Sequence, residues 1–223
     1  TERFFGRAGI TMPTTQEFVD AGINFEDIAT VYAQEKDAGH EPQMVVAANG
    51  LSLETWRQLC RDIGKASAKE SASSERPKLL IYAKYGIITN WSILTDLSHL
   101  PGAGANSRVM THQGIPWTIR IIPGTPAPTV TEVDHAYKEA QHPTISDYLT
   151  LQAIRCELGE AAVDPVVDPA LETAFPYSTW LAGDFVNGTQ APYGSISRDD
   201  HRIDLEWRFC DFKFYSFGAR PAV

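Results

Sequence analysis

The stretch RIDLEWRF, residues 202–209, constrains the fold of this chain more than any other. Its apolar and charged side chains alternate without interruption: Ile203, Leu205, Trp207 and Phe209 against Arg202, Asp204, Glu206 and Arg208. Because successive side chains of a strand point to opposite faces, this pattern predicts an antiparallel strand with one face buried and the other in water. A β-sheet must therefore form part of the core.

Further strands are predicted on both sides of this one. KLLIYAKY, residues 78–85, reads as a short strand, and residues 102–124 read as a hairpin that turns at Gln113-Gly114. In the hairpin's second strand, Trp117, Ile119 and Ile121 lie on one face. The closing FKFYSFGARPA, residues 212–222, predicts a last strand at a sheet edge, because Pro221 has no backbone N–H to donate.

Helices are predicted mainly in the first third. Thr14 and Glu17 form a capping-box pattern, and Asn24 precedes a second helix that stops near Gly39. After Ser52 the apolar residues recur at helical spacing: Trp56, Leu59, Cys60 and Ile63. The polar stretch that follows, up to Pro77, is predicted to be the end of this helix and a linker.

A later helix is predicted from Thr144 to Leu158, ending at Gly159. Its apolar residues spread well beyond a single stripe, which indicates that more than one side of the helix is covered. The intervening residues 123–141 show no apolar period and contain Gly and Pro breaks, so a long loop is expected there.

Composition bounds the class of protein. At 223 residues with 43% hydrophobic residues, the chain can bury a sizeable core. The net charge of −9 argues against nucleic acid or an anionic membrane as the main partner, since both need clustered Lys and Arg. No stretch approaches the roughly 20 apolar residues of a membrane span, and the first residues lack the apolar core of a signal peptide.

The three cysteines, Cys60, Cys156 and Cys210, are widely spaced and include no CxxC pair. An odd count at such spacing excludes a disulfide framework and disfavours a zinc ribbon. We therefore expect buried thiols that behave as small apolar side chains. The sequence leaves the cellular compartment open.

Three segments together resemble a known family. HPTISDYLTLQAIR (142–155), STWLAGDF (178–185) and YSFGARPAV (215–223) are similar to the capped helix start, the tryptophan strand and the terminal Gly-x-Arg-Pro strand of bacterial and phage C-type lectin-like modules. That superfamily includes the formylglycine-generating enzymes. The resemblance implies an α+β domain over residues 78–223, with two helices packed on twisted antiparallel sheets, and residues 1–77 are then expected to be an N-terminal helical extension.

The chain departs from the family where its chemistry would lie. The calcium-dependent sugar motifs are absent from the resembling region, and Cys156 and Cys210 are far apart in sequence, unlike the close reactive pair of the formylglycine-generating type. The histidine cluster of the iron-dependent members is also absent. The resemblance therefore implies a scaffold, and we expect no cofactor and no metal.

Aromatic side chains give the best indication of binding. Tyr177, Trp180, Phe185 and Tyr193 lie in segments predicted as loops or strand ends, where exposed rings stack on sugars or anchor protein ligands. The alternative is that these rings fill the core. With Asp200 and His201 they form the predicted ligand-binding set of the 177–201 segment, with the 100–135 loops as a further possible surface.

The sequence also allows two other kinds of site. Asp199, Asp200 and a backbone carbonyl could surround a calcium ion, although the same residues suit a charged turn. An enzyme with a dispersed site would draw on His112, Asp200, His201 and Cys210, but no adjacent acid and nucleophile mark any of them as catalytic.

The sequence thus predicts a non-catalytic ligand-binding or structural module with a protein or carbohydrate ligand. The alternatives are an enzyme on the same scaffold and an oligomeric structural subunit. In the oligomeric alternative, a homo-oligomer would form with the N-terminal helices packed between protomers, as the amphipathic 53–63 segment suggests.

Overall fold

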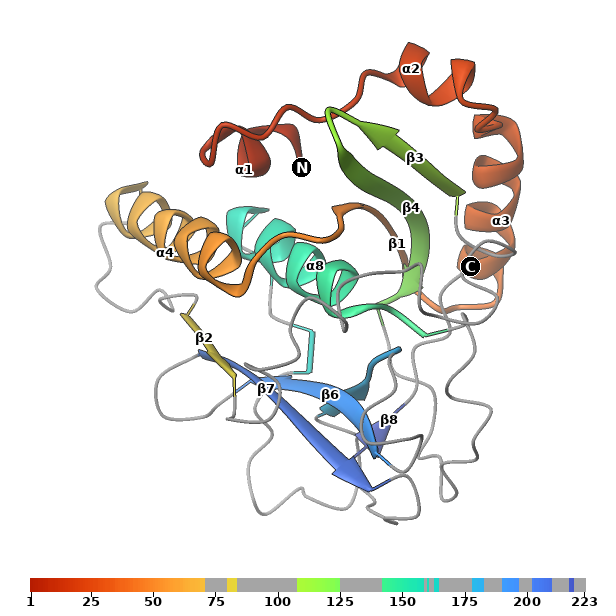
Figure 1. The fold of residues 1–223 in the computed structure, drawn as a ribbon. Coiled ribbons are helices and arrows are strands. Elements are labelled where there is room, and N and C mark those ends of the chain that lie inside the picture. The colour runs from red at the N-terminus through yellow and green to blue at the C-terminus, as the bar shows by residue number, and fades with distance from the viewer. Residues whose placement is uncertain are drawn as a thin grey trace.

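The structure is a computed structural model that describes residues 1–70, 80–83, 108–124, 142–158, 160, 163–164, 178–182, 190–196, 202–209 and 217–218. Over these ranges the chain is a mixed α+β protein, with helices packed on two β-sheets (Figure 1). This confirms the predicted α+β class.

The elements follow one another as α1 (Glu2–Gly6), α2 (Thr15–Asp20), α3 (Phe25–Asp37), β1 (Pro42–Ala48), α4 (Leu53–Glu70), β2 (Leu80–Ala83), β3 (Arg108–His112), β4 (Ile115–Pro123), α8 (Ile145–Leu158), β5 (Ser178–Trp180), β6 (Gln190–Ile196), β7 (Arg202–Phe209) and β8 (Phe217–Gly218). No described helix combines the length and the apolar character that crossing a membrane requires.

The first sheet has three antiparallel strands in the order β1-β4-β3. The predicted hairpin of β3 and β4 is confirmed, with His112 paired to Ile115 across the turn. Gln113 and Gly114 both adopt positive φ, 51° and 78°, which is the conformation that a tight two-residue hairpin turn needs. The turn residues therefore set the register of the hairpin locally.

The second sheet has five strands in the order β2-β7-β6-β5-β8. β7 lies inside this sheet, and its alternation is confirmed at the described positions, because Ile203 and Leu205 are fully buried while Asp204 and Glu206 are half-buried. β6 is antiparallel to both β5 and β7, but β2 pairs parallel to β7 and β8 parallel to β5.

The predicted antiparallel pairing is therefore confirmed for the first sheet and for β5, β6 and β7, whereas β2 and β8 join the second sheet in parallel. Alternation within a strand reports which face is buried and carries no information on the direction of the neighbouring strand. Only the two residues of β8 are described in the closing segment, where β8 occupies a sheet edge next to β5. Pro221 lies outside the described residues.

The predicted helix starts are confirmed at the caps. The Thr14 hydroxyl accepts the Glu17 N–H at 3.2 Å and the Glu17 carboxylate accepts the Thr14 N–H at 2.8 Å, a complete capping box for α2. Asn24 caps α3, and the Ser52 hydroxyl accepts the Thr55 N–H at 3.1 Å to cap α4. These short-range bonds satisfy N–H groups that a helix start leaves without partners.

The N-terminal third is not purely helical, which corrects the prediction for residues 1–77. β1 forms between α3 and α4 and pairs along its whole length with β4, from Pro42 opposite Pro123 to Ala48 opposite Trp117. Its last four residues are all buried, so no alternation marks it in the sequence. Strand pairing thus crosses the predicted boundary at residue 77.

The core gathers around α8, which lies between the two sheets (Figure 1). Every residue of α8 from Ile145 to Ala153 is buried, which confirms that more than one side of this helix is covered. Trp56, Leu59 and Cys60 of α4 are also fully buried in the same cluster.

Candidate functional site

Two of the six predicted ligand-binding residues lie in the described part, and both are interior. Trp180 on β5 is 1% exposed and Tyr193 on β6 is 6% exposed. Their rings meet edge to face with centroids 6.1 Å apart, and the Tyr193 hydroxyl donates to the Glu206 carboxylate on β7. These rings take the alternative role weighed from the sequence, packing within the core, and offer no face to a ligand. Tyr177, Phe185, Asp200 and His201 lie outside the described residues.

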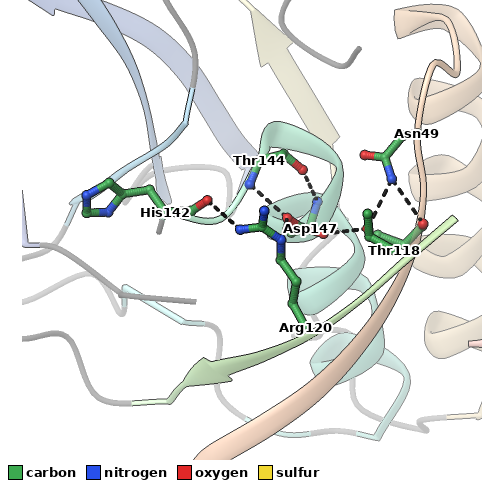
Figure 2. Close-up of polar contacts among 7 residues, drawn as sticks. Asn49, Thr118, Arg120, His142, Thr144 and Asp147 are labelled. Atoms are coloured by element: carbon green, nitrogen blue, oxygen red, sulfur yellow. Dashed lines mark hydrogen bonds and ion pairs between the residues drawn. The ribbon is translucent and has the colours of Figure 1, made fainter. Parts of the chain in front are cut away.

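The most developed polar arrangement is instead buried at the start of α8 (Figure 2). Thr144 and Asp147 form a reciprocal cap: the Asp147 carboxylate accepts the Thr144 N–H at 2.9 Å, and the Thr144 hydroxyl accepts the Asp147 N–H at 3.1 Å. The cap predicted from the Pro-Thr-x-x-Asp pattern is thus confirmed, but both residues are fully buried rather than at the surface.

Strand β4 supplies the next layer of this arrangement. The Thr118 hydroxyl donates to Asp147 Oδ1 at 3.2 Å, and the Asn49 side-chain amide donates to Thr118 at 3.0 Å and to the Ala47 carbonyl at 3.3 Å. Each step of this chain joins a different element, from the end of β1 through β4 to α8. The bonds therefore hold the helix start against the three-stranded sheet.

Arg120, two residues further along β4, brings a charge into the same place. Its guanidinium Nε lies 3.4 Å from Asp147 Oδ2, and its Nη1 donates to the His142 carbonyl at 2.8 Å. Arg120 is 1% exposed and Asp147 is fully buried, so the pair sits outside the reach of water. A buried guanidinium is tolerated because a carboxylate and a carbonyl face it.

His142, just before the helix, is held neutral by the same surroundings. Burial, followed by the positive charge of Arg120, lowers the pKa of His142 to about 4. Both causes disfavour the imidazolium form. The ring is therefore uncharged at neutral pH, as its buried place beside a guanidinium requires.

A second set of bonds ties α8 to the five-stranded sheet. The Tyr148 hydroxyl donates to Asp164 Oδ2 at 2.9 Å, and the Thr179 hydroxyl of β5 donates to the same oxygen at 2.7 Å. The Tyr148 ring lies directly on Gly194 of β6, where a Cβ atom would come within 2.7 Å of its Cζ. Glycine permits this approach because it has no side chain.

The two sets together define what this region can do. Both oxygens of Asp147 already accept hydrogen bonds, and Asp164 accepts two hydroxyls on one oxygen. These carboxylates are buried and committed to holding the helix, so neither is placed to act on a molecule at the surface. We call these two sets the helix bracing network, made of Asn49, Thr118, Arg120, His142, Thr144, Asp147, Tyr148, Asp164 and Thr179.

The residues considered for an enzyme or a metal site are only partly described. His112, at the end of β3, lies 3.2 Å from the Glu17 carboxylate on α2. The Thr14 cap, and to a smaller degree His112, hold the pKa of Glu17 below its usual value. Asp199, Asp200, His201 and Cys210 lie outside the described residues. In the part of the chain that is described, no group of three His, Cys, Asp or Glu side chains could hold a metal ion.

The two described cysteines, Cys60 and Cys156, have the apolar surroundings that the sequence predicts. Cys60 is fully buried, and burial, with Cys156 close to it, raises the pKa of its thiol. Cys156 is half-buried and packs against the same core cluster. A protonated thiol inside an apolar cluster is a poor nucleophile.

Sequence reasoning missed most of the helix bracing network. It identified Thr144 and Asp147 through their capping pattern, but it assigned no role to Thr118 or Arg120. These two alternate with the apolar residues of WTIRII, and the adjacent pair Ile121-Ile122 is a signal that both faces of this strand are covered. Polar residues on such a strand are then buried and need partners.

No protein-family model matches this chain, and neither the curated proteins nor the solved structures include a match to it. The fold and the network therefore define it as a mixed α+β protein with a polar, charge-paired core around one central helix.

Proposed function

We propose that this chain is a non-catalytic ligand-binding or structural module whose described part is a rigid scaffold. In this proposal the 177–201 segment contacts a protein or a carbohydrate. One observation carries it: the chain enters β5 and β7 at the same end of the five-stranded sheet. Ser178 on β5 and Asp204 on β7 both pair with Ser195 of β6, and both strands run antiparallel to β6.

This register supports treating two parts of the predicted binding set as one proposed surface. Tyr177 immediately precedes β5 in the sequence, and Asp200 and His201 immediately precede β7. Neighbouring strands lie about 5 Å apart, so Ser178 of β5 and Asp204 of β7, which flank Ser195 of β6, lie roughly 10 Å apart, and β7 begins two residues before Asp204. This closeness of the two described strands supports the proposal that one ligand contacts the segments leading into both.

A rigid support makes such a surface effective, because ordering loops on binding costs free energy. The helix bracing network supplies the support, since Thr179 of β5 bonds Asp164 and Gly194 of β6 lies against Tyr148. β5 and β6 are thus fixed to α8 on their inner side.

We further propose that residues 78–223 adopt a C-type lectin-like fold. Its support is the capped helix starting at Thr144, the short tryptophan strand β5 and the edge strand β8 beside it. In this proposal β1 extends the scaffold from the N-terminal segment. A protein or glycan ligand then follows from the way in which such scaffolds are used.

The test uses variants at the two entry points. Glycan-array and candidate-protein binding is measured for the wild type, Tyr177→Ala, His201→Ala and a control, Val19→Ser, whose side chain is 47% exposed on α2. We expect each entry-point variant to weaken binding about tenfold or more, as for a central contact residue, while Val19→Ser binds normally. Unchanged affinity in both entry-point variants would place the ligand elsewhere. Turnover dependent on a stoichiometric bound metal would favour the enzyme alternative.

A further inference from the structure

The first ten residues form a unit of their own, which we call the N-terminal arm. It contains α1 and the turn after it. The backbone hydrogen bonds that the structure shows for this arm join residues within it. Among them, the Phe5 N–H donates to the Thr1 carbonyl at 3.1 Å, and the Ile10 N–H donates to the Phe5 carbonyl at 3.1 Å. The arm is therefore held to the body of the protein through its side chains.

Two phenylalanines anchor the arm in what we call the aromatic socket, formed by Trp56 of α4 and Trp117 of β4. Phe4 and Phe5 are both fully buried. The Phe5 ring meets Trp117 edge to face with centroids 5.0 Å apart, and it meets Trp56 at 5.9 Å. Phe4 lies 6.0 Å from Trp56. Such contacts combine large apolar burial with the ring geometry that aromatic pairs prefer.

An ion pair fixes the orientation of the arm. Arg7 Nη2 lies 2.6 Å from Glu157 Oε1 near the end of α8, and both side chains are 18% exposed. Arg3 adds a weaker contact, with its Nε 3.9 Å from the same carboxylate oxygen. The socket thus recognises a short helix that presents two phenylalanines and an arginine one turn later.

The arm is attached through a simple hinge. Thr11, Met12 and Pro13 belong to no helix or strand, and within the described residues no backbone hydrogen bond joins them to another part of the chain. α1 has only five residues, far below the roughly 12 that an isolated helix needs, so its order depends on the socket. The arm can therefore leave its socket without breaking any strand or helix of the body.

Docking also leaves a cost inside the socket. Among the described residues, neither the Trp56 nor the Trp117 indole N–H has a hydrogen-bond acceptor, although both atoms are buried. A buried donor without an acceptor costs free energy.

We propose that the N-terminal arm is an exchange element, by which two copies of this chain form a closed symmetric dimer. Each copy places Phe4, Phe5 and Arg7 in the socket and against Glu157 of the other. The contacts in the dimer are those seen within one chain, so exchange costs mainly the entropy of association and is favoured by concentration. This inference is independent of the ligand-binding proposal.

The experiment uses two full-length variants, Arg7→Glu and Glu157→Arg, whose charges are complementary when the arm of one variant docks on the other. Each variant alone brings like charges together, both within one chain and in its own exchanged dimer. In an exchanged dimer of one copy of each, both ion pairs are restored, one with the original polarity and one with the reversed polarity. The double variant with both substitutions in one chain is the matched control, because it restores the pair inside the monomer.

Mass is measured by light scattering after size-exclusion chromatography of an equimolar mixture, first partly unfolded in mild urea to let arms exchange. We expect the dimer fraction of the mixture to exceed that of either variant alone by about tenfold, because two favourable pairs replace two like-charge contacts. A mixture in which every species has the mass of one chain would overturn the proposal. Dimers equally abundant in each single variant would overturn it too, because their interface would not include the arm.

Discussion

At the scale of single residues, Gly194 is a point of close approach between α8 and the five-stranded sheet. A Cβ there would come within 2.7 Å of Tyr148 Cζ, and that ring cannot move freely because its hydroxyl bonds Asp164. We expect Gly194→Ala to lower the free energy of unfolding by about 1–3 kcal/mol, as overpacking does. Urea denaturation measures the change.

The matched control for that substitution is Gly6→Ala. Gly6 is an exposed residue of α1, and a Cβ there would meet nothing within 4 Å. Replacing glycine by alanine in a helix at such a site stabilises by about 0.5–1 kcal/mol. Equal unfolding free energies for the two variants would contradict the close packing of Tyr148 on Gly194.

His142 makes stability depend on pH through a single ring. Its pKa falls from an ordinary 6.5 to about 4 on folding, so the unfolded chain binds the proton more readily. The stability that the neutral His142 ring allows is fully present above pH 6.5 and is lost as the pH falls toward 4. Between pH 7.5 and pH 5 this amounts to about 2 kcal/mol.

His142→Gln tests this dependence, because glutamine does not titrate. We expect the unfolding free energy of the wild type to decrease more steeply than that of the variant between pH 7.5 and pH 5, as followed by urea denaturation at each pH. Parallel pH profiles for the two proteins would show that this ring does not change its protonation on unfolding.

At the scale of elements, the junction of α8 with β4 depends on the carboxylate of Asp147. Asp147→Asn removes the charge that faces the buried Arg120 guanidinium at 3.4 Å. Leaving one partner of a buried ion pair without the other costs about 3–5 kcal/mol. We therefore expect a large loss of thermal stability, measured by calorimetry.

Glu54→Gln is the control for this element-scale prediction. Glu54 also pairs with an arginine, Arg61, at 2.7 Å, but its side chain is 69% exposed. Exposed pairs contribute little because water screens them. If the two substitutions cost the same, the Arg120–Asp147 pair would not be a buried one.

The elements that could be predicted from the sequence are those that local chemistry determines. The capping pairs of Thr14 with Glu17 and of Thr144 with Asp147 define their helix starts, and alternation defines β7. β1 could not be found in this way, because a strand buried on both faces has no alternation. The parallel direction of β2 is equally invisible, since it depends on how distant segments meet.

The helix bracing network was predictable only in part for the same reason. Its cap is a short-range pattern, but the contacts of Thr118 and Arg120 join residues that are far apart in the sequence. From the sequence alone, a polar residue on a strand is expected to face solvent, because the element that covers it is not known. The burial of Trp180 and Tyr193 likewise depends on packing that composition leaves open.

At the scale of the whole molecule, strand pairing crosses the boundary predicted at residue 77. β4 pairs with β1 along its length, and Trp117 packs against Phe5 of the arm. A chain of residues 78–223 would expose these faces and leave one edge of β4 without its partner strand. We expect this fragment to lack a cooperative urea transition, while the full chain shows coincident transitions by circular dichroism and tryptophan fluorescence.

The fragment can be rescued if that explanation is correct. Residues 1–77 supply β1, α4 and the aromatic ring contacts, so mixing the two fragments should restore near-native circular dichroism through pairing of β1 with β4. Val45→Lys in the smaller fragment is the matched control, because Val45 is fully buried on β1 and a charge there blocks docking. A fragment of residues 78–223 that unfolds cooperatively by itself would make the C-terminal part an independent domain and β1 an accessory strand.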